Sequence, residues 1–256
     1  MRRLNGVLTL VALASLPSAL MPAGFGPLAP AAVQAQDALS LVKQAAKNYA
    51  NDVRGVVAFR SVSESRINAP MINQTIRSTT FTVQKDGIPV KVIMERIVTN
   101  GKEASADDLS KQSTKTTATY QEGKGFFKAP YDLRYMDAYT FKLESCSDCA
   151  PGTTAIRFTS AIKDDQHGTG TMILDEAMRV REVRYSPNAY PPNVTSGVLS
   201  LVRDEVGKGM VAVRNIKVDY QGAMGPLKGS FVMDLRNEGF RRYASVEEAI
   251  AQAKTP

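Results

Sequence analysis

Tryptophan is absent from the sequence, histidine occurs once and cysteine occurs twice. Two cysteines are too few for a disulfide-dense scaffold, an iron–sulfur protein or a protein with several zinc sites. A single histidine, His167, also excludes the usual histidine-rich metal centres. We therefore expect neither a metal ion nor a cofactor.

The remaining composition is that of a globular protein. The chain has 256 residues, of which 43% are hydrophobic and 22% are charged, and this length suits one or two domains. Its formal net charge is +7, but Arg2 and Arg3 are the only charged residues among the first 35. From Gln36 onward the net charge is therefore only +5.

Residues 1–35 have the pattern of a cleaved signal peptide. Arg2 and Arg3 give a basic start, and the apolar run from Val7 to Leu16 follows. This run is too short to span a bilayer, which needs about 20 residues. Small side chains at Val33 and Ala35 place the cleavage before Gln36. We expect residues 36–256 to form one domain that is exported to the periplasm.

Hydrophobic periodicity predicts one helix followed by strands. A helix is expected from Asp37 to about Val53, because apolar residues recur there at three- and four-residue steps. From Arg54 the period changes to two, which is typical of strands. The predicted strands are Gly55–Ser63, Thr75–Lys85, Ile88–Thr99, Tyr139–Cys146, Thr153–Lys163, Gly168–Asp175, Met178–Ser186, Gly197–Val206, Met210–Tyr220 and Leu227–Arg236.

Short connections between these strands favour an antiparallel meander. Asp86-Gly87 is typical of a type I′ hairpin turn. A parallel sheet would need helices of about ten or more residues between strands, and only Gly101–Tyr120 has room for one, over Ala104–Gln112. Ser245 and Glu248 form a capping box for a helix at the C-terminal end.

Several strands are apolar on both faces, as in Ile88–Thr99, and such strands need cover on both sides. Between Val180 and Val183 the apolar phase slips, which indicates a bulge that bends the strand. We predict a mainly-β fold with flanking helices (α+β). It consists of a single curved antiparallel sheet, or incomplete β-barrel, with helices over its concave side.

In this arrangement the chain resembles the LolA-like family of periplasmic carriers of outer-membrane lipoproteins, which also includes a related sensor. The resemblance covers nearly all of residues 36–256: an amphipathic helix follows the signal peptide and leads directly into a strand and a long meander. Gly168–Asp175 and Met178–Tyr185 are similar to the hairpin with an acidic turn that is common in such proteins. The resemblance implies an incomplete barrel whose apolar cavity is covered by helices.

Cys146 and Cys149 are the sharpest local motif. A redox-active pair at this spacing needs a helix N-terminus to lower the thiol pKa, but Ala150-Pro151-Gly152 and another strand follow here. A zinc site would need two more ligands. In an exported protein the favoured interpretation is a disulfide between the two cysteines, with redox and metal roles as alternatives.

Asp164, Asp165 and His167 place two carboxylates and an imidazole in one turn. Carboxylates in turns usually accept hydrogen bonds from backbone N–H groups. The sequence has neither a Gly-x-Ser-x-Gly elbow nor a His-Glu-x-x-His motif. We therefore assign no catalytic residue, and an exported envelope hydrolase that uses this turn stays as an alternative function.

A curled sheet would enclose apolar space, because side chains on one face of each strand point inward. Methionines suit such a space, since their flexible thioethers repack easily around variable acyl chains. The residues expected to line it are Val90, Val92, Met94, Ile156, Phe158, Phe231, Met233 and Leu235, with Leu39, Val42 and Tyr49 of the first helix over its mouth. A solid core made of the same residues is the competing interpretation.

We expect an exported, non-catalytic carrier or sensor, monomeric, that binds a lipid, an acyl chain or a lipoprotein. An envelope protein is a further expected partner, and a structural envelope-assembly role is a further alternative. The basic clusters Arg179/Arg181/Arg184 and Phe240–Tyr243 suit transient contact with anionic head groups. The favoured interpretation of these clusters is a solvated surface whose charge Glu182 and Glu238 balance. Nucleic acid is not expected, because no basic stripe with stacking aromatics is present.

Overall fold

The computed structural model describes residues 30–253, except 71, 125–126, 191–192, 208 and 225–226. Most of the predicted signal peptide lies outside these residues, and its cleavage before Gln36 stays a prediction. The elements are α1 (Pro30–Asp52), β1 (Val56–Ala69), β2 (Ile72–Lys85), β3 (Ile88–Thr99), β4 (Lys102–Glu103), α2 (Ala106–Gln121), a 3₁₀ turn (Met136–Ala138), β5 (Tyr139–Glu144), β6 (Thr154–Ser160), β7 (Gly168–Leu174), β8 (Val180–Pro187), β9 (Val194–Gly207), β10 (Met210–Met224), β11 (Leu227–Tyr243) and α3 (Val246–Ala253).

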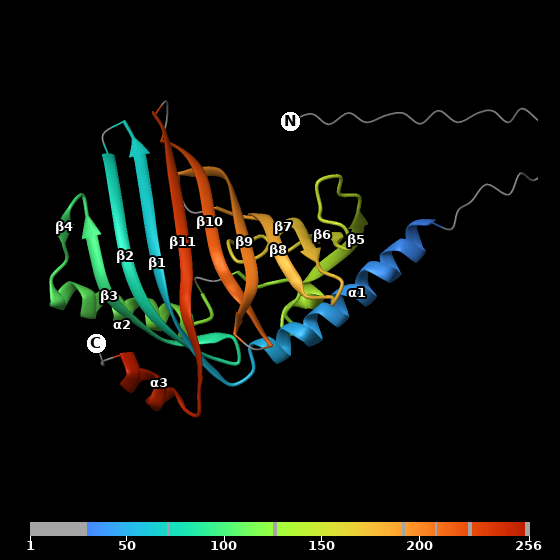
Figure 1. Ribbon diagram of the computed structural model, residues 1–256. Coiled ribbons are helices and arrows are strands. Elements are labelled where there is room, and N and C mark those ends of the chain that lie inside the picture. The colour runs from blue at the N-terminus through green and yellow to red at the C-terminus, as the bar shows by residue number, and fades with distance from the viewer. Residues whose placement is uncertain are drawn as a thin grey trace, which may run out of the picture.

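The described strands form one open, curved, antiparallel sheet in the order β4-β3-β2-β1-β11-β10-β9-β8-β7-β6-β5 (Figure 1). The first strand, β1, lies inside this sheet and not at an edge. It pairs with β2 on one side and with the last strand, β11, on the other. β2 to β4 run out to one edge, and β5 to β11 return from the opposite edge. The predicted curved sheet with flanking helices is therefore confirmed.

Two turns show how local sequence sets the strand boundaries. Asp86 and Gly87 have φ of 51° and 79°, as a type I′ turn requires, which confirms the predicted hairpin. Asn100 and Gly101 adopt the same conformation, with φ of 49° and 83°, and lead into β4. The sequence analysis assigned Gly101–Tyr120 only to a connection with room for a helix, and it did not predict this short strand.

The predicted bulge in β8 is also confirmed. Leu174 pairs with Val180, but its neighbour Ile173 pairs with Glu182, so Arg181 is the extra residue. Because of this shift, Val180 and Val183 can both be fully buried.

α1 lies against the β5 end of the sheet (Figure 1). It begins at Pro30, so Asp37 lies inside the helix and not at its start, where the sequence analysis placed it. At its other end, Arg242 Nη2 donates a hydrogen bond of 2.8 Å to the carbonyl of Asp52. This contact satisfies one of the carbonyls that every helix leaves without a partner at its C-terminus.

α2 covers the free edge of β3 and is longer than the predicted Ala104–Gln112. Thr117 Oγ1 accepts a hydrogen bond from the Val92 N–H at 3.0 Å and donates to the Val92 carbonyl at 3.2 Å. One turn away, Ser113 Oγ accepts from the Met94 N–H at 2.8 Å. Side chains at helical spacing thus take the place of a neighbouring strand along this edge.

α3 packs on the opposite face of the sheet from α1. Its predicted cap at Ser245 is confirmed, because Ser245 Oγ accepts from the Glu248 N–H at 3.1 Å. Glu248 Oε2 accepts at 2.9 Å from the N–H of Ala244, one residue before the cap, and not from the Ser245 N–H of a capping box. Ala249 is fully buried in a small cluster with Val56, Ala58, Phe81 and Val83. The alternate residues of β1 and β2, including Phe59 and Thr82, face the other way, into the cavity described next.

A larger core fills the other half of the concave side. The buried face of α1, with Ala38, Val42, Ala45 and Ala46, packs there on β5 to β9. Ile156, Phe158 and Met172 are fully buried in this cluster. The β5–β8 half of the sheet is therefore filled by α1, and any room for a ligand lies elsewhere.

Candidate functional site

A cavity of about 410 Å³ lies on the concave face, over β9, β10, β11 and the start of β1. Its floor is the sheet, and its walls include Tyr49 and Val53 of α1 and the segment from Phe127 to Tyr135. The volume falls within the range of small-molecule sites, which is roughly 300–1,000 Å³. This cavity is the candidate binding site.

The floor consists of rows of side chains that cross three strands. Leu201, Ile216 and Leu235 form one row, because Ile216 pairs with Leu201 on β9 and with Leu235 on β11. Two residues farther along each strand, Leu199, Val218 and Met233 form the next row in the same way. All six residues line the cavity. Together they form a continuous apolar strip.

Serines border this strip on β1. Ser63 pairs with Leu235, and Ser65 pairs with Met233, so the apolar rows end at small polar side chains. Ser61 continues the series and donates a hydrogen bond of 2.7 Å to Asn237 Oδ1. Small residues here leave space that larger side chains would fill.

The strip ends at a buried arginine. Arg203 lies two residues after Leu201 on the same face of β9, and its side chain is 1% exposed. Its Nη2 donates to the Val211 carbonyl at 2.8 Å and lies 3.4 Å from Asp52 Oδ2 of α1. Asp52 Oδ1 also accepts a hydrogen bond from the Val211 N–H at 3.2 Å. The cavity therefore changes from polar to apolar along β9.

Two tyrosines enclose this arginine. Its guanidinium carbon lies 5.0 Å from the ring centre of Tyr49 and 5.5 Å from that of Tyr131, close enough for cation–π attraction. The two rings meet edge to face at 5.1 Å. Burial raises the pKa of both hydroxyls above their ordinary value, so both stay protonated at neutral pH.

The segment after α2 forms the wall opposite the strands. Phe127 stacks on Tyr185 of β8 with ring centres 3.8 Å apart. Asp132 is buried and accepts hydrogen bonds of 2.9 and 3.1 Å from Arg134 Nε. Because Asp132 and Arg134 pair with each other, Arg134 adds little unpaired charge to the cavity.

Only some of the residues predicted from the sequence line this cavity. Met233, Leu235 and Tyr49 do. Ile156, Phe158 and Val42 are fully buried in the core that α1 fills. Leu39 is 37% exposed on α1.

The other predicted lining residues lie next to the cavity or on the far side of the sheet. Phe231 is one row beyond Met233, where its ring contacts Tyr220. Val92 and Met94 lie under α2. Val90 packs instead with Ile93 against the α3 cluster, because an irregular register opposite Val83 and Gln84 interrupts the alternation of β3. Period-two spacing alone could not place Val90.

Several lining residues were not anticipated from the sequence. Leu199 and Leu201 stood in a strand that was noted as apolar on both faces, but they were not assigned to the cavity. Arg203 gave a usable signal, since it follows these two residues at a spacing of two within a predicted strand. Tyr131 gave none, because it lies in an irregular segment whose path depends on tertiary packing.

Comparison with solved structures finds matches of low sequence identity. The chain is similar to the crystal structure of a DUF1329 family protein from Desulfovibrio piger, with 12% identity, coverage of 83% of this chain and 95% of that one, and a TM-score of 0.41. It is similar to a LolA superfamily protein from Nitrosomonas europaea, with 9% identity, 82% and 96% coverage, and a TM-score of 0.35.

A domain described as an outer membrane lipoprotein-sorting protein, from Vibrio parahaemolyticus, matches with 10% identity, 86% and 98% coverage, and a TM-score of 0.40. No protein-family model and no curated protein matches the sequence. All three TM-scores are below 0.5, so these likenesses assign no function to this chain.

The predicted disulfide is present. Cys146 and Cys149 are bonded, in the connection between β5 and β6. Neither cysteine lines the cavity. The bond thus closes a short loop away from the candidate site.

The turn at Asp164 is held by hydrogen bonds within itself. Asp164 Oδ1 accepts from the backbone N–H groups of Gln166 and His167 at 3.0 and 2.7 Å, and both carboxylate oxygens lie 2.9 Å from His167 Nδ1. Burial acts to raise the pKa of Asp164, but these hydrogen bonds outweigh it and hold the pKa below its ordinary value. His167 is 4% exposed, and neither residue lines the cavity. The hydrolase alternative is not supported.

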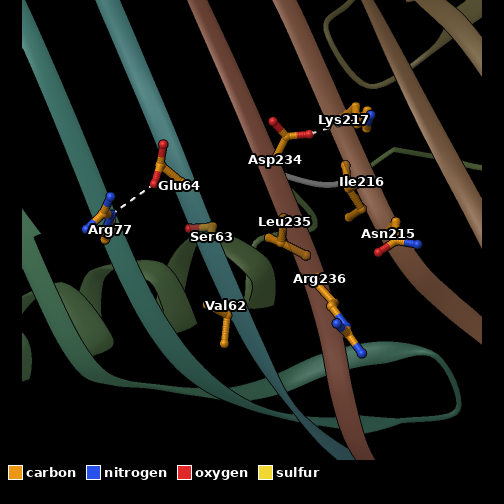
Figure 2. Close-up of a pocket in the computed structure, with 10 residues that line it drawn as sticks. All are labelled: Val62, Ser63, Glu64, Arg77, Asn215, Ile216, Lys217, Asp234, Leu235 and Arg236. Atoms are coloured by element: carbon orange, nitrogen blue, oxygen red, sulfur yellow. Dashed lines mark hydrogen bonds and ion pairs between the residues drawn. The ribbon is translucent and has the colours of Figure 1, made fainter.

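A second hollow, of about 380 Å³, crosses β2, β1, β11 and β10. Figure 2 shows two charged pairs in it, Glu64 with Arg77 and Lys217 with Asp234, and Arg236 beside them. The pairs are separated by 2.9 and 4.0 Å. These pairs are largely exposed to water, where such contacts contribute little. This hollow has the chemistry of an ordinary solvated sheet surface.

Among the described residues, no group of three or more His, Cys, Asp or Glu side chains is arranged to hold a metal ion. No helix in the same part of the chain is long and apolar enough to cross a membrane.

Proposed function

We propose that this chain is an exported, non-catalytic carrier or sensor that holds an acyl chain in the cavity on its concave face. The observation that carries the proposal is the apolar strip across β9, β10 and β11, which lines a cavity of about 410 Å³. A concave, mostly apolar cavity with a few polar groups at one end is the usual form of a small-molecule site.

The strip suits a flexible hydrocarbon. Each methylene group moved from water onto such a surface contributes about 0.8 kcal/mol. Met233 adapts to ligands of different shape, because its unbranched thioether has several accessible rotamers. Phe127, Tyr49 and Tyr131 cover the strip with rigid rings. The site therefore has the parts that non-specific acyl binding needs.

Export and membrane contact complete the proposal. Residues 1–35 have the pattern of a signal peptide, which would place the mature chain in the periplasm. Acyl chains are nearly insoluble in water, so a carrier must receive and deliver them at a membrane or through an envelope protein. We propose transient contact with such a partner, and we propose a monomer as the active form.

The experiment is native mass spectrometry of the exported protein, purified without detergent, followed by lipid extraction. We expect a fraction of the protein to carry an acyl lipid. Leu235→Trp places an indole in the first apolar row and should abolish this bound fraction. Val232→Trp is the matched control, since Val232 lies on the same strand, is 38% exposed and faces away from the cavity.

An unliganded wild-type protein that also takes up no acyl lipid from added vesicles would overturn the proposal. Equal lipid loss in Leu235→Trp and Val232→Trp would overturn the placement of the site. Circular dichroism of both variants shows whether each is folded.

A further inference from the structure

Arg203 carries an unused hydrogen-bond donor at the polar end of the cavity. Its Nη groups contact Val211, Asp52 and Val180, but its Nε has no partner among the described residues, although the side chain is 1% exposed. Buried side-chain nitrogens are nearly always satisfied, because an unpaired one has lost its hydrogen bonds to water. Arg203 lines the cavity, and its unpaired, covered Nε therefore indicates a missing acceptor at this end of the site.

The charge of Arg203 is also compensated incompletely. A charge-assisted N–H···O contact normally measures about 2.7–2.9 Å, whereas Asp52 Oδ2 lies 3.4 Å from Nη2. Asp52 shares its other oxygen with the Val211 N–H. Tyr49 and Tyr131 attract the cation through the faces of their rings, which leaves the Nε–H bond without an acceptor.

We propose that the ligand is a single-chain amphiphile with a carboxylate head, of the long-chain fatty acid class, and that one carboxylate oxygen accepts the Arg203 Nε–H. This assignment rests on the proposed acyl-binding function and adds the head group to it. The acyl chain would lie over the rows that contain Leu201 and Leu199, which precede Arg203 on the same face of β9.

The dimensions fit one acyl chain. Four residues of strand separate Arg203 from Leu199, a length of about 13 Å at roughly 3.3 Å per residue. One leaflet of a bilayer's hydrocarbon core, which is one acyl chain deep, is about 15 Å. A volume of about 410 Å³ lies near the lower end of the range for small-molecule sites. This favours one chain with a small head over a lipid with several chains.

The other charged groups at this end favour a single small anion. Arg134 and Asp132 neutralise each other. The side-chain amide of the neighbouring Asn237 already has partners: its Oδ1 accepts from Ser61 Oγ, and its Nδ2 donates to the Val213 carbonyl. Among the fully buried side-chain nitrogens and oxygens of the described residues, Arg203 Nε is the one without a partner.

The test compares two probes of equal chain length, palmitate and hexadecanol, titrated into the wild-type mature protein by isothermal calorimetry below the concentration at which they aggregate. We expect palmitate to bind at least tenfold more tightly. Equal affinities would overturn the carboxylate assignment while leaving acyl binding intact. Binding of neither probe would overturn the proposed function as well. Tighter binding of a lysophosphatidate than of palmitate would replace the carboxylate by a phosphate head.

A variant then assigns the preference to Arg203. Arg203→Met should remove the difference between palmitate and hexadecanol, while Arg77→Met, on the exposed outer surface, should preserve it. A retained preference in folded Arg203→Met would overturn the role of this residue. If Arg203→Met does not fold, the comparison of the two probes on the wild-type protein decides the head group by itself.

Discussion

The guanidinium carbon of Arg203 lies 5.0 Å from the ring centre of Tyr49, which joins the middle of β9 to the last turns of α1. Three residues farther along α1, Asp52 reaches the same guanidinium and the backbone of β10. These contacts fix the end of α1 at the polar end of the cavity. The stability of this half of the protein should depend on them.

Asp52→Ala should therefore destabilise the protein strongly. The substitution leaves Arg203 buried without its nearest carboxylate and removes the acceptor of the Val211 N–H. Breaking a buried ion pair in this way typically costs about 3–5 kcal/mol of the free energy of unfolding. Urea unfolding followed by circular dichroism measures this loss. Asp219→Ala, at an exposed position, should change stability by less than about 0.5 kcal/mol. Equal effects of the two substitutions would disprove the structural role of Asp52.

Thr117→Val should loosen the edge of β3. The substitution preserves the shape of the side chain but leaves the Val92 N–H and carbonyl without their partner on α2. An unsatisfied buried group costs about 1–3 kcal/mol. Hydrogen exchange followed by mass spectrometry should show faster exchange in β3. Thr114→Val, on the exposed side of the same helix, should leave exchange in β3 unchanged.

Replacement of both Cys146 and Cys149 by serine should have a small effect. In the chain-entropy model a disulfide that closes so short a loop stabilises by about 2 kcal/mol. The bond also lies away from the cavity lining. We expect a modest fall in melting temperature and unchanged acyl binding. Loss of binding by a folded double variant would instead indicate a redox role for the pair.

Asp164 should make stability depend on pH in the acid range. Its pKa is lowered in the folded protein, so its ionised form stabilises the fold relative to the unfolded chain. This contribution is complete above the unfolded pKa of about 4 and is lost as the pH falls through the lowered folded pKa. Asp164→Asn should therefore be less stable than wild type at pH 7, and the difference should shrink in acid. Asp165→Asn, at the exposed neighbour, should follow the wild-type curve.

The sheet could be predicted from sequence because its turns and its alternation are local properties. Asp86-Gly87 and the shifted phase between Val180 and Val183 are examples, and both predictions are confirmed. The cavity could be predicted only in part. Phe158 and Met233 both lie on inward faces of strands, and only the position of α1 decides that Phe158 is covered while Met233 faces open space.

Long-range packing also determines the polar end of the site. The sequence separates Asp52 from Arg203 by 151 residues, and no local pattern relates them. Their contact follows from the return of the chain across the whole sheet, which brings β9 under the end of α1. The same holds for Tyr131, whose segment has no regular structure of its own.

Methyl NMR of the mature protein with ¹³C-methyl methionine tests the central claim most directly. Met233 lines the apolar strip, whereas Met172 is fully buried in the core that α1 fills. On titration with palmitate, we predict a large shift of the Met233 methyl signal, with direct contacts to the acyl chain, and an unchanged Met172 signal. Met233→Leu and Met172→Leu assign the two signals. A Met233 signal that stays in place at saturating palmitate would contradict the account.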